Sequence, residues 1–320
     1  MALALFAQSG VLSGRSAAGP PGPSASLAAP ELSQLVKSAL LPGRQDAPRL
    51  GPEVARCALK VGDYKECHSH YPVGCSRAEA PRFDAYLNLL KNQLVRPELE
   101  PLRFLEKEDF EDLDQQTPKE LKKSNHKQLK DRLTALGEGR VHGLFGYLYY
   151  AHSSPGESSN CQASRQVDSD FHIGIGFDPE LAGELADKLA EHQEPTDEEK
   201  DEVKRTSVIV EMTPHQRALF RSNWTLRIVK AAIGRQVRVV GQLLIDSEHN
   251  NRRDNCALGN QDDCWRASVW ELHPVTRFQV CKSASCTTTS GDWVDVADLD
   301  KADLEVAATG TQILQNEIHK

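Results

Sequence analysis

The residues best suited to chemistry stand at the start of an apolar stretch, VDSDFHIGIGF at 167–177. Asp168, Asp170 and His172 occur at every second position there, and a strand directs such side chains to one face. Carboxylate and imidazole groups are common ligands of hydrolytic metal ions, and a metal-bound water is a nucleophile at neutral pH. Polar residues at strand ends also serve as caps and turn formers. The spacing therefore predicts either a metal or acid–base site, or a polar loop that enters a strand.

Three further phrases join an acid to a histidine beside an apolar run: EMTPH at 211–215, DSEH at 246–249 and ELH at 271–273. Because the chain has 46 acids and 11 histidines, such pairs also arise by chance. Glu271 and His273 fit a buried polar network equally well. For a metal-dependent hydrolase we expect a divalent metal ion as cofactor. The residues it would use are, as catalytic groups, Asp168, Asp170 and Glu211 and, as metal ligands, Asp170, His172 and His273.

Aromatic residues and one arginine supply a second kind of candidate site. Tyr147, Tyr149, Arg217 and Trp265 are the candidates for binding a ligand, because aromatic faces and cations hold stacked or anionic groups. Core packing is the more common explanation of the two tyrosines, since a small barrel needs bulky fillers. Trp265 lies in a polar loop beside Cys264, so we expect its ring to be accessible.

The elements that position these residues follow from hydrophobic periodicity. RFDAYLNLLKNQL predicts an amphipathic helix, and Thr117 with Pro118 predicts the start of a second helix that ends near Gly137. The period then changes to that of strands. Five strands are predicted in RVHGLFGYLYYAH, DFHIGIGF, SVIVEM, GRQVRVVGQLLID and ASVWELHPVTRFQVC, with a helical connection, TPHQRALFRSNWTLRIVKAAIG, between the third and the fourth.

This order, with glycines inside the first and fourth strands, resembles an OB-fold barrel over about 138–282. The predicted fold class is therefore mainly β with helices (α+β): a five-stranded OB-like barrel with a helical N-terminal preface. The phrases PVGCS, YLNLLKNQ, DSDFHI, VIVEMTP and WELHPVT are also similar to a family of uncharacterised bacterial proteins. That resemblance implies one unit over about 71–286 but no activity.

Among OB-fold proteins, staphylococcal-type nucleases offer an enzymatic comparison. They use carboxylates for calcium, two arginines for the phosphate and a glutamate base. Asp168, Asp170 and Glu211, with Arg165 and Arg217, are residues of the right types. Their spacing departs from the family's motifs, so no role is transferred.

Composition divides the chain into four parts. Residues 1–55, rich in Ser, Ala, Gly and Pro, are predicted to be a disordered leader or linker. Residues 56–137 form a cysteine-containing, helical preface, and 138–286 form the barrel with an acidic insertion at 178–206. Residues 287–320 form a C-terminal tail.

The eight cysteines include two close pairs, neither with the CxxC spacing of zinc knuckles or redox sites. Loop-stapling disulfides are favoured over reduced thiols and over metal ligation, with candidates Cys161, Cys256, Cys264, Cys281 and Cys286. Disulfides within or between the loops of 161 and 256–264 would fix a cleft rim. They favour a periplasmic or secreted protein, and the apolar run in MALALFAQSG resembles part of an export signal.

The net charge of −8 disfavours general nucleic-acid binding, although 217–238 is locally basic. No apolar segment approaches the roughly 20 residues of a transmembrane helix. The leading interpretation is an exported OB-like binding module for single-stranded nucleic acid, a glycan or a protein. The alternatives are the metal-dependent hydrolase, with phosphodiesters as one substrate class, and a structural envelope protein.

Overall fold

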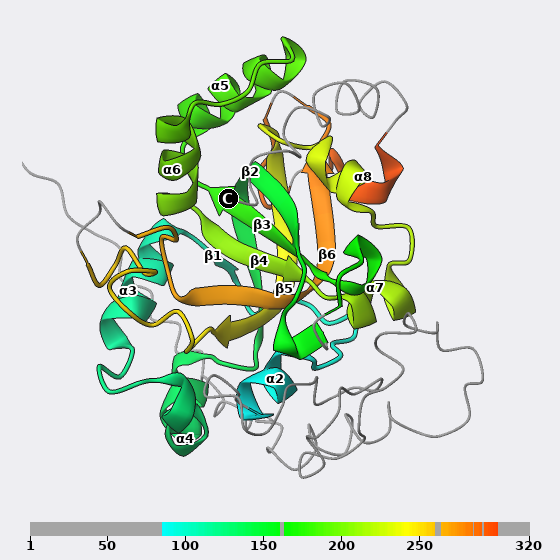
Figure 1. Cartoon of the computed structure of the whole chain (residues 1–320). Helices are drawn as coiled ribbons and strands as arrows, with labels where there is room; N and C mark the ends of the chain where they lie inside the picture. Colours follow the sequence, from blue (N-terminus) through cyan, green and yellow to red (C-terminus); the bar gives the residue numbers. More distant parts are fainter. Residues whose placement is uncertain (1–84, 161–162, 260–263, 284, 290, 300–320) are drawn as a thin grey trace, which may run out of the picture. The chain divides into compact units, whose positions relative to one another are not determined.

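A mixed sheet carries the helices of the structure, a computed structural model that describes residues 85–160, 163–259, 264–283, 285–289 and 291–299 (Figure 1). All of these residues lie in one unit, 46–320. Within them the strands are β1 (Phe104–Leu105), β2 (Val141–Ser154), β3 (Asp170–Gly176), β4 (Val208–Met212), β5 (Gln236–Ile245), β6 (Trp270–Cys281) and β7 (Trp293–Asp295).

Five of the strands close a ring through their hydrogen bonds. The order is β2-β3-β4-β6-β5, and β5 pairs back onto β2. All neighbours in the ring are antiparallel except β4 and β6, which are parallel. β1 adds to β2 and β7 adds to β6. The α+β class and the five predicted strands are confirmed, but the ring is not a regular barrel, because β4 and β6 share a single pair, Val210 with Leu272.

The helices within the described residues are α2 (Ala85–Lys91), α3 (Lys107–Gln116), α4 (His126–Leu136), α5 (Pro179–Ala190), α6 (Asp197–Arg205), α7 (Pro214–Phe220) and α8 (Leu226–Lys230). In Figure 1, α2 and α4 lie at one end of the ring, and α5 and α6 lie at the other. The predicted acidic insertion supplies α5 and α6, so it is helical.

One predicted helix start is wrong. Thr117 is the C-cap of α3, where its backbone N–H donates to the carbonyls of Leu113 and Asp114. Pro118 then follows the helix end, where proline is common because it cannot continue a helix. The predicted end at Gly137 is confirmed: this glycine has φ 120°, and its N–H donates to the carbonyl of Leu133.

The connection between β4 and β5 contains two short helices instead of one. Thr213 caps α7 by accepting from the N–H of Gln216, and Thr225 caps α8 by accepting from the N–H of Ile228. Each capping threonine marks the start of a helix, because its hydroxyl accepts from an N–H of the first turn. In a continuous helix those N–H groups would instead bond to backbone carbonyls within the helix. The segment between them turns at Trp224, which is buried and donates its indole N–H to Asp295.

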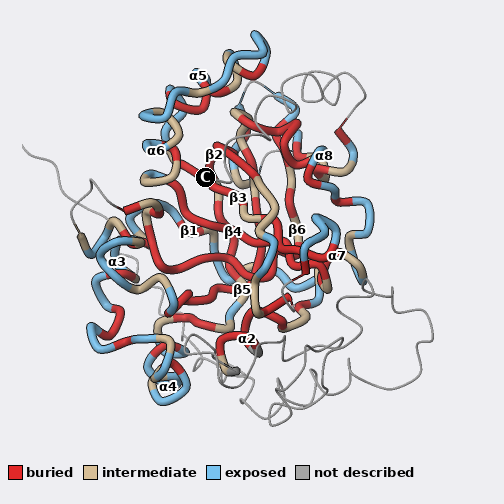
Figure 2. Tube along the Cα trace, in the orientation of Figure 1, coloured by how far each residue is buried: buried red, intermediate tan, exposed pale blue. Residues whose placement is uncertain are grey.

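The apolar core lies inside the ring and beneath the helices (Figure 2). Alternate residues of β3 and β4, among them Ile173 and Val210, are fully buried there. Their neighbours in sequence, such as His172 and Glu211, point to the opposite face of the sheet because the side-chain period of a strand is two.

Glycine at position 174 allows an aromatic ring to lie flat on β3. A Cβ atom there would stand 2.2 Å from Cε1 of Tyr150, the residue opposite it on β2. The glycine therefore serves to admit this ring.

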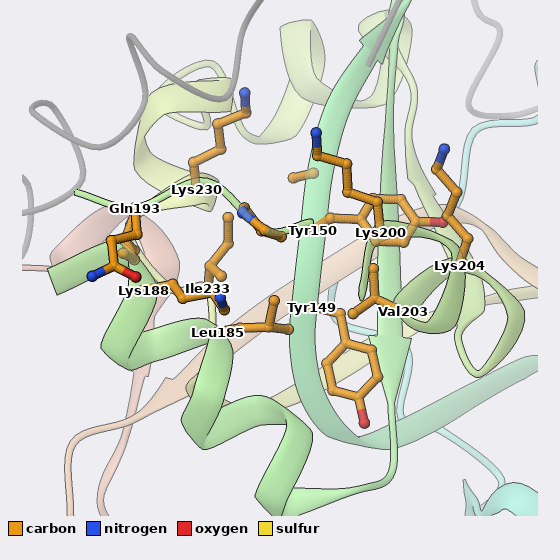
Figure 3. A pocket seen from close by; sticks show the side chains of 13 residues that line it. Tyr149, Tyr150, Leu185, Lys188, Gln193, Lys200, Val203, Lys204, Lys230 and Ile233 are labelled. Atoms are coloured by element: carbon orange, nitrogen blue, oxygen red, sulfur yellow. The ribbon is translucent and has the colours of Figure 1, made fainter. Parts of the chain in front are cut away.

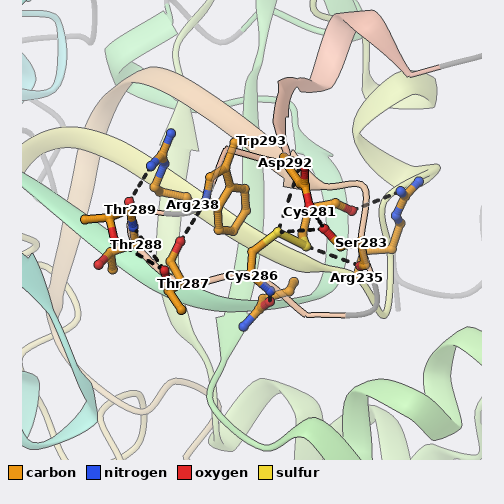
Figure 4. Close-up of a disulfide and its surroundings, with 11 residues drawn as sticks. Arg235, Arg238, Cys281, Ser283, Cys286, Thr287, Thr288, Thr289, Asp292 and Trp293 are labelled. Carbon is orange, nitrogen blue, oxygen red and sulfur yellow. Dashed lines mark hydrogen bonds between the residues drawn. A yellow bond between two sulfur atoms is a disulfide. The ribbon is translucent and has the colours of Figure 1, made fainter.

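Two disulfides staple loops of the described residues. Cys256–Cys264 closes the loop between β5 and β6, and Cys281–Cys286 closes a turn at the end of β6. The second packs with Trp293 in a small buried cluster, and the indole donates to the carbonyl of Thr287 (Figure 4). These two predicted pairs are confirmed and are consistent with an extracytoplasmic protein. Cys161 lies outside the described residues.

No helix in the described ranges is long and apolar enough to cross a membrane; α5, with 12 residues, falls well short of the roughly 20 required.

Replacing Gly174 by alanine should destabilise the fold by about 1–3 kcal/mol, because the added methyl group collides with the ring of Tyr150. Gly183→Ala is the matched control, since Gly183 is an exposed position of α5 with nothing within 4 Å of its Cβ position, and the change should stabilise by about 0.4–1 kcal/mol. Urea unfolding of both variants measures the difference. Equal free energies of unfolding for the two variants would show that packing of the Tyr150 side chain does not depend on this glycine.

Candidate functional site

Polar side chains from three adjacent strands gather on the sheet face opposite the core. His172 of β3 pairs directly with Glu211 of β4. Val210 pairs with Leu272 of β6, so Glu211 and the residues that flank Leu272 share the other face. The resulting group, named here the Glu211 cluster, comprises Glu157, Asp170, His172, Glu211 and His273.

Glu211 is the centre of this cluster. Its Oε1 lies 3.0 Å from Nε2 of His172, and its Oε2 lies 2.9 Å from Nδ1 of His273. The Glu211 side chain is 1% exposed. Burial alone would raise its pKa, but His172, Lys91 and His273 outweigh burial and hold the pKa well below its usual value. Glu211 is therefore an ionised carboxylate between two imidazoles.

Helix α2 covers the cluster. The last residue of this helix, Lys91, accepts a 2.8 Å hydrogen bond from Nε2 of His273 at its backbone carbonyl. Its ammonium lies 2.8 Å from Asp246 and 3.9 Å from Glu211. Since a carbonyl only accepts, Nε2 of His273 carries a proton. Nδ1 is the nitrogen left to face the carboxylates, Glu211 at 2.9 Å and Glu271 at 3.3 Å.

Both histidines are held as imidazolium. Burial would lower the pKa of His172, but Glu211 and Glu157 raise it well above its usual value. Burial would also lower the pKa of His273, yet Glu211 raises it to about 10. The pKa of Glu157 is in turn lowered to about 2, because His172, 2.9 Å away, outweighs its burial.

Asp170 differs from the other carboxylates. It is 1% exposed, its Oδ2 accepts from Nδ2 of Asn160 at 2.5 Å, and its Oδ1 has no hydrogen-bond partner. Burial and the nearby charges of Glu157 and Glu211 raise the pKa of Asp170 to about 7. A carboxyl group that titrates near neutral pH is suited to proton transfer.

The charges around the cluster balance when Asp170 is protonated. Arg266 adds a guanidinium, 1% exposed, that lies 2.7 Å from Glu271. Four carboxylates then face four cations: Glu157, Glu211, Asp246 and Glu271 against Lys91, His172, His273 and Arg266. Ionised Asp170 adds one negative charge that has no salt bridge among the described residues, although buried Arg217 interacts with it electrostatically.

Two overlapping sets of three residues bring ligand atoms within 4.8 Å of one another, and Glu211 belongs to both. They are Glu157, His172 and Glu211, and Asp170, Glu211 and His273. The second set is enclosed, whereas the side chains of Glu157 and His172 in the first are 20% and 15% exposed. The first set therefore forms the accessible end of the cluster.

The predicted metal ligands Asp170, His172 and His273 thus meet, together with the predicted catalytic residue Glu211. Asp168 does not join them. Its carboxylate is buried against the guanidinium of Arg165 and accepts from Nε at 2.6 Å. Of the three alternating residues of DSDFH, two, Asp170 and His172, therefore lie in the cluster.

The residues predicted to bind a ligand are packed or already bonded. Tyr149 is 2% exposed, and Tyr147 packs half-buried against the core. Arg217 is 5% exposed, lies over the ring of Phe171 and donates to the carbonyls of Met212, Val167 and Ser169. Trp265, expected to be accessible, is half-buried and donates its indole N–H to Asp254.

Sequence reasoning missed two members of the site. Glu157 lies in the loop SSPGESSN, which has no periodicity, and Lys91 ends an amphipathic helix where a lysine is ordinary. Only the phrase DSEH, which contains Asp246, pointed toward the partner of Lys91. Lys91 reaches the site from a segment distant in the chain, and Glu157 reaches it from the loop that precedes β3.

No protein-family model matches the chain, and comparison with curated proteins and with solved structures finds no significant match. The resemblance to uncharacterised bacterial proteins gains no support from these comparisons. Function therefore has to be argued from the geometry of the cluster.

The raised pKa of His273 should make stability depend on pH. Since its folded pKa, about 10, exceeds the ordinary value of 6.5, its contribution is complete below pH 6.5 and is lost as pH rises from 6.5 towards 10. Urea unfolding between pH 6 and 10 should show this decline, and His273→Asn should flatten it. Nitrogen NMR of the imidazole reads the pKa directly in the unaltered protein. A pKa near 6.5 would contradict the ion pairing with Glu211.

Proposed function

We propose that this protein is a divalent-metal-dependent hydrolase whose reaction centre is the Glu211 cluster. The observation that carries this is the convergence of Glu157, His172 and Glu211 at the accessible end of an otherwise buried charged cluster. Three protein ligands leave coordination positions for water and substrate.

The spacing of these side chains suits one ion. Nε2 of His172 lies 2.9 Å from Glu157 Oε1 and 3.0 Å from Glu211 Oε1. Metal–ligand bonds of about 2.0–2.2 Å in tetrahedral geometry separate neighbouring ligand atoms by roughly 3.4 Å, so a small outward shift accommodates the ion. Imidazole with two carboxylates suits Zn²⁺ or Mn²⁺. The ion would take the place of the proton on Nε2 of His172, which now lies between the two carboxylates.

The enclosed residues would orient and balance this centre. His273 holds Glu211 through Oε2 and is itself fixed by the carbonyl of Lys91, as partners of metal-ligating carboxylates commonly are. A cation between Glu157 and Glu211 offsets the two charges that keep Asp170 protonated. Asp170 would then ionise and serve as the base for the attacking water.

When bound, the ion would polarise the scissile group and lower the pKa of a bound water. Phosphodiesters are the substrate class we propose, since charge develops on oxygens that a divalent cation stabilises. The negative net charge favours small diesters over nucleic-acid polymers.

The frame for this centre is, in this proposal, a distorted OB-like barrel in an exported protein. Three relations support it: β2 pairs with β5, β4 runs parallel to β6, and helices connect β4 to β5. The two disulfides support export. Binding of single-stranded nucleic acid by stacking is less well supported, because Tyr149 is buried and the indole of Trp265 is hydrogen-bonded to Asp254.

Metal binding should release protons. At pH 7 we expect between one and two protons per Zn²⁺, one from His172 and the rest from Asp170, with the number rising as pH falls. Titration calorimetry in buffers of different ionisation enthalpy measures this number. His172→Asn should weaken Zn²⁺ binding at least tenfold, and Glu248→Gln, an exposed carboxylate paired with Lys123, should leave it unchanged. Binding of Zn²⁺ without proton release would place the ion elsewhere.

Activity should depend on the base. With Zn²⁺ or Mn²⁺ bound, Asp170→Asn should lower kcat/KM for bis(p-nitrophenyl) phosphate by about 100-fold, within the range for general-base groups. The same variant should still bind the ion, and Glu248→Gln should retain full activity. Loaded wild-type protein that hydrolyses neither this diester nor a carboxylic ester would refute the hydrolase.

A further inference from the structure

A pocket lies between α5, α6, α8 and the tyrosines of β2 (Figure 3). Its walls are largely apolar and include Leu185, Leu189, Val203 and Ile233. Four lysines also line it: Lys188, Lys200, Lys204 and Lys230. Figure 3 shows the ammonium groups of Lys200, Lys204 and Lys230 directed to one side of the pocket and the phenol of Tyr149 to the other.

Two of these lysines are already neutralised. Lys188 lies 3.1 Å from Glu199, and Lys200 lies 3.5 Å from Asp197. The ammonium groups of Lys204 and Lys230 have no carboxylate within 4 Å among the described residues. The pocket therefore carries an excess of positive charge over an apolar lining.

Lys230 is the unusual member. It is 4% exposed, and burial lowers its pKa, while no carboxylate of the described residues lies close enough to form a salt bridge with it. A buried ammonium without a counter-charge costs stability, and such cations are normally paired. An anionic ligand would supply the missing partner.

We propose that this pocket binds a small organic anion with an apolar body, of the chemical class of aliphatic or aromatic carboxylates. The hydrocarbon part would lie against Leu185, Val203 and Ile233, and the carboxylate would lie on the side of Lys204 and Lys230. Ligand sites commonly combine an apolar lining with a few charged groups that fix orientation.

This site is distinct from the Glu211 cluster, although the two are close. Tyr150 lines the pocket, its ring stacks on His152 at 5.9 Å, and His152 lies 5.4 Å from His172, measured between ring centroids. The inference rests on the pocket alone and holds or fails independently of metal binding.

The test compares two fluorescent probes that differ in one charge, 11-(dansylamino)undecanoic acid and its methyl ester. The acid should bind at least tenfold more tightly, and excess decanoate should displace it. Raising the salt concentration should weaken binding of the acid and leave binding of the ester unchanged. Equal affinity of the two probes would show that the pocket is an apolar groove that does not recognise the carboxylate, and would contradict the proposal. If neither probe bound, the proposed ligand site would be refuted.

Lys230→Met and Lys204→Met should each weaken binding of the acid about tenfold without affecting binding of the ester. Lys230→Met should also raise the melting temperature by a few degrees, since it removes an uncompensated buried charge. The matched controls are Lys127→Met and Lys130→Met on exposed α4. A variant at Lys230 that lowers the melting temperature and leaves acid binding intact would assign this lysine to the fold and contradict the proposal.

Discussion

A single buried carboxylate sets the conditions for the rest of the site. Glu211 lies on the central strand β4, ionised and 1% exposed, where an unpaired charge would cost several kcal/mol. Two imidazoles and an ammonium from three different elements compensate it: His172 of β3, His273 of β6 and Lys91 of α2. Because these partners must all be present, docking of α2 and closure of the ring between β4 and β6 are coupled to the charge of Glu211.

The topology explains why the partners meet. Parallel pairing of β4 with β6 puts Glu211 on the same face as His273, although 61 positions separate them along the chain. Antiparallel pairing of β3 with β4 sets His172 opposite Glu211. Around this centre, Lys91 with Asp246 and Arg266 with Glu271 neutralise the remaining charges. These paired groups balance one another when Asp170 is protonated, and in the proposed function the ionisation of Asp170 links metal binding to proton release.

Local sequence patterns account for much of this structure. Period two in DSDFHI and in WELH placed Asp170, His172 and His273 on strands and on consistent faces. The strands β1 and β7, of two and three residues, are too short to show a period. Lys91 and Glu157 reach the site through tertiary contacts that no local pattern encodes. The sequence around Thr117 and Pro118 is compatible with either the start or the end of a helix, and in the structure it is the end of α3. The exposure expected of Trp265 failed because Asp254 offered its indole a partner within the same loop.

The central claim is that the accessible end of the Glu211 cluster holds a divalent cation. Anomalous diffraction from crystals soaked in Zn²⁺ or Mn²⁺, recorded on both sides of the metal's absorption edge, tests it most directly. The account predicts a peak bonded to Nε2 of His172 and to the carboxylates of Glu157 and Glu211, and no such peak in crystals of His172→Asn. The account would be contradicted if the metal ion fully occupied another position while His172 still lay between Glu157 and Glu211. The cluster would then be an internal network of ion pairs.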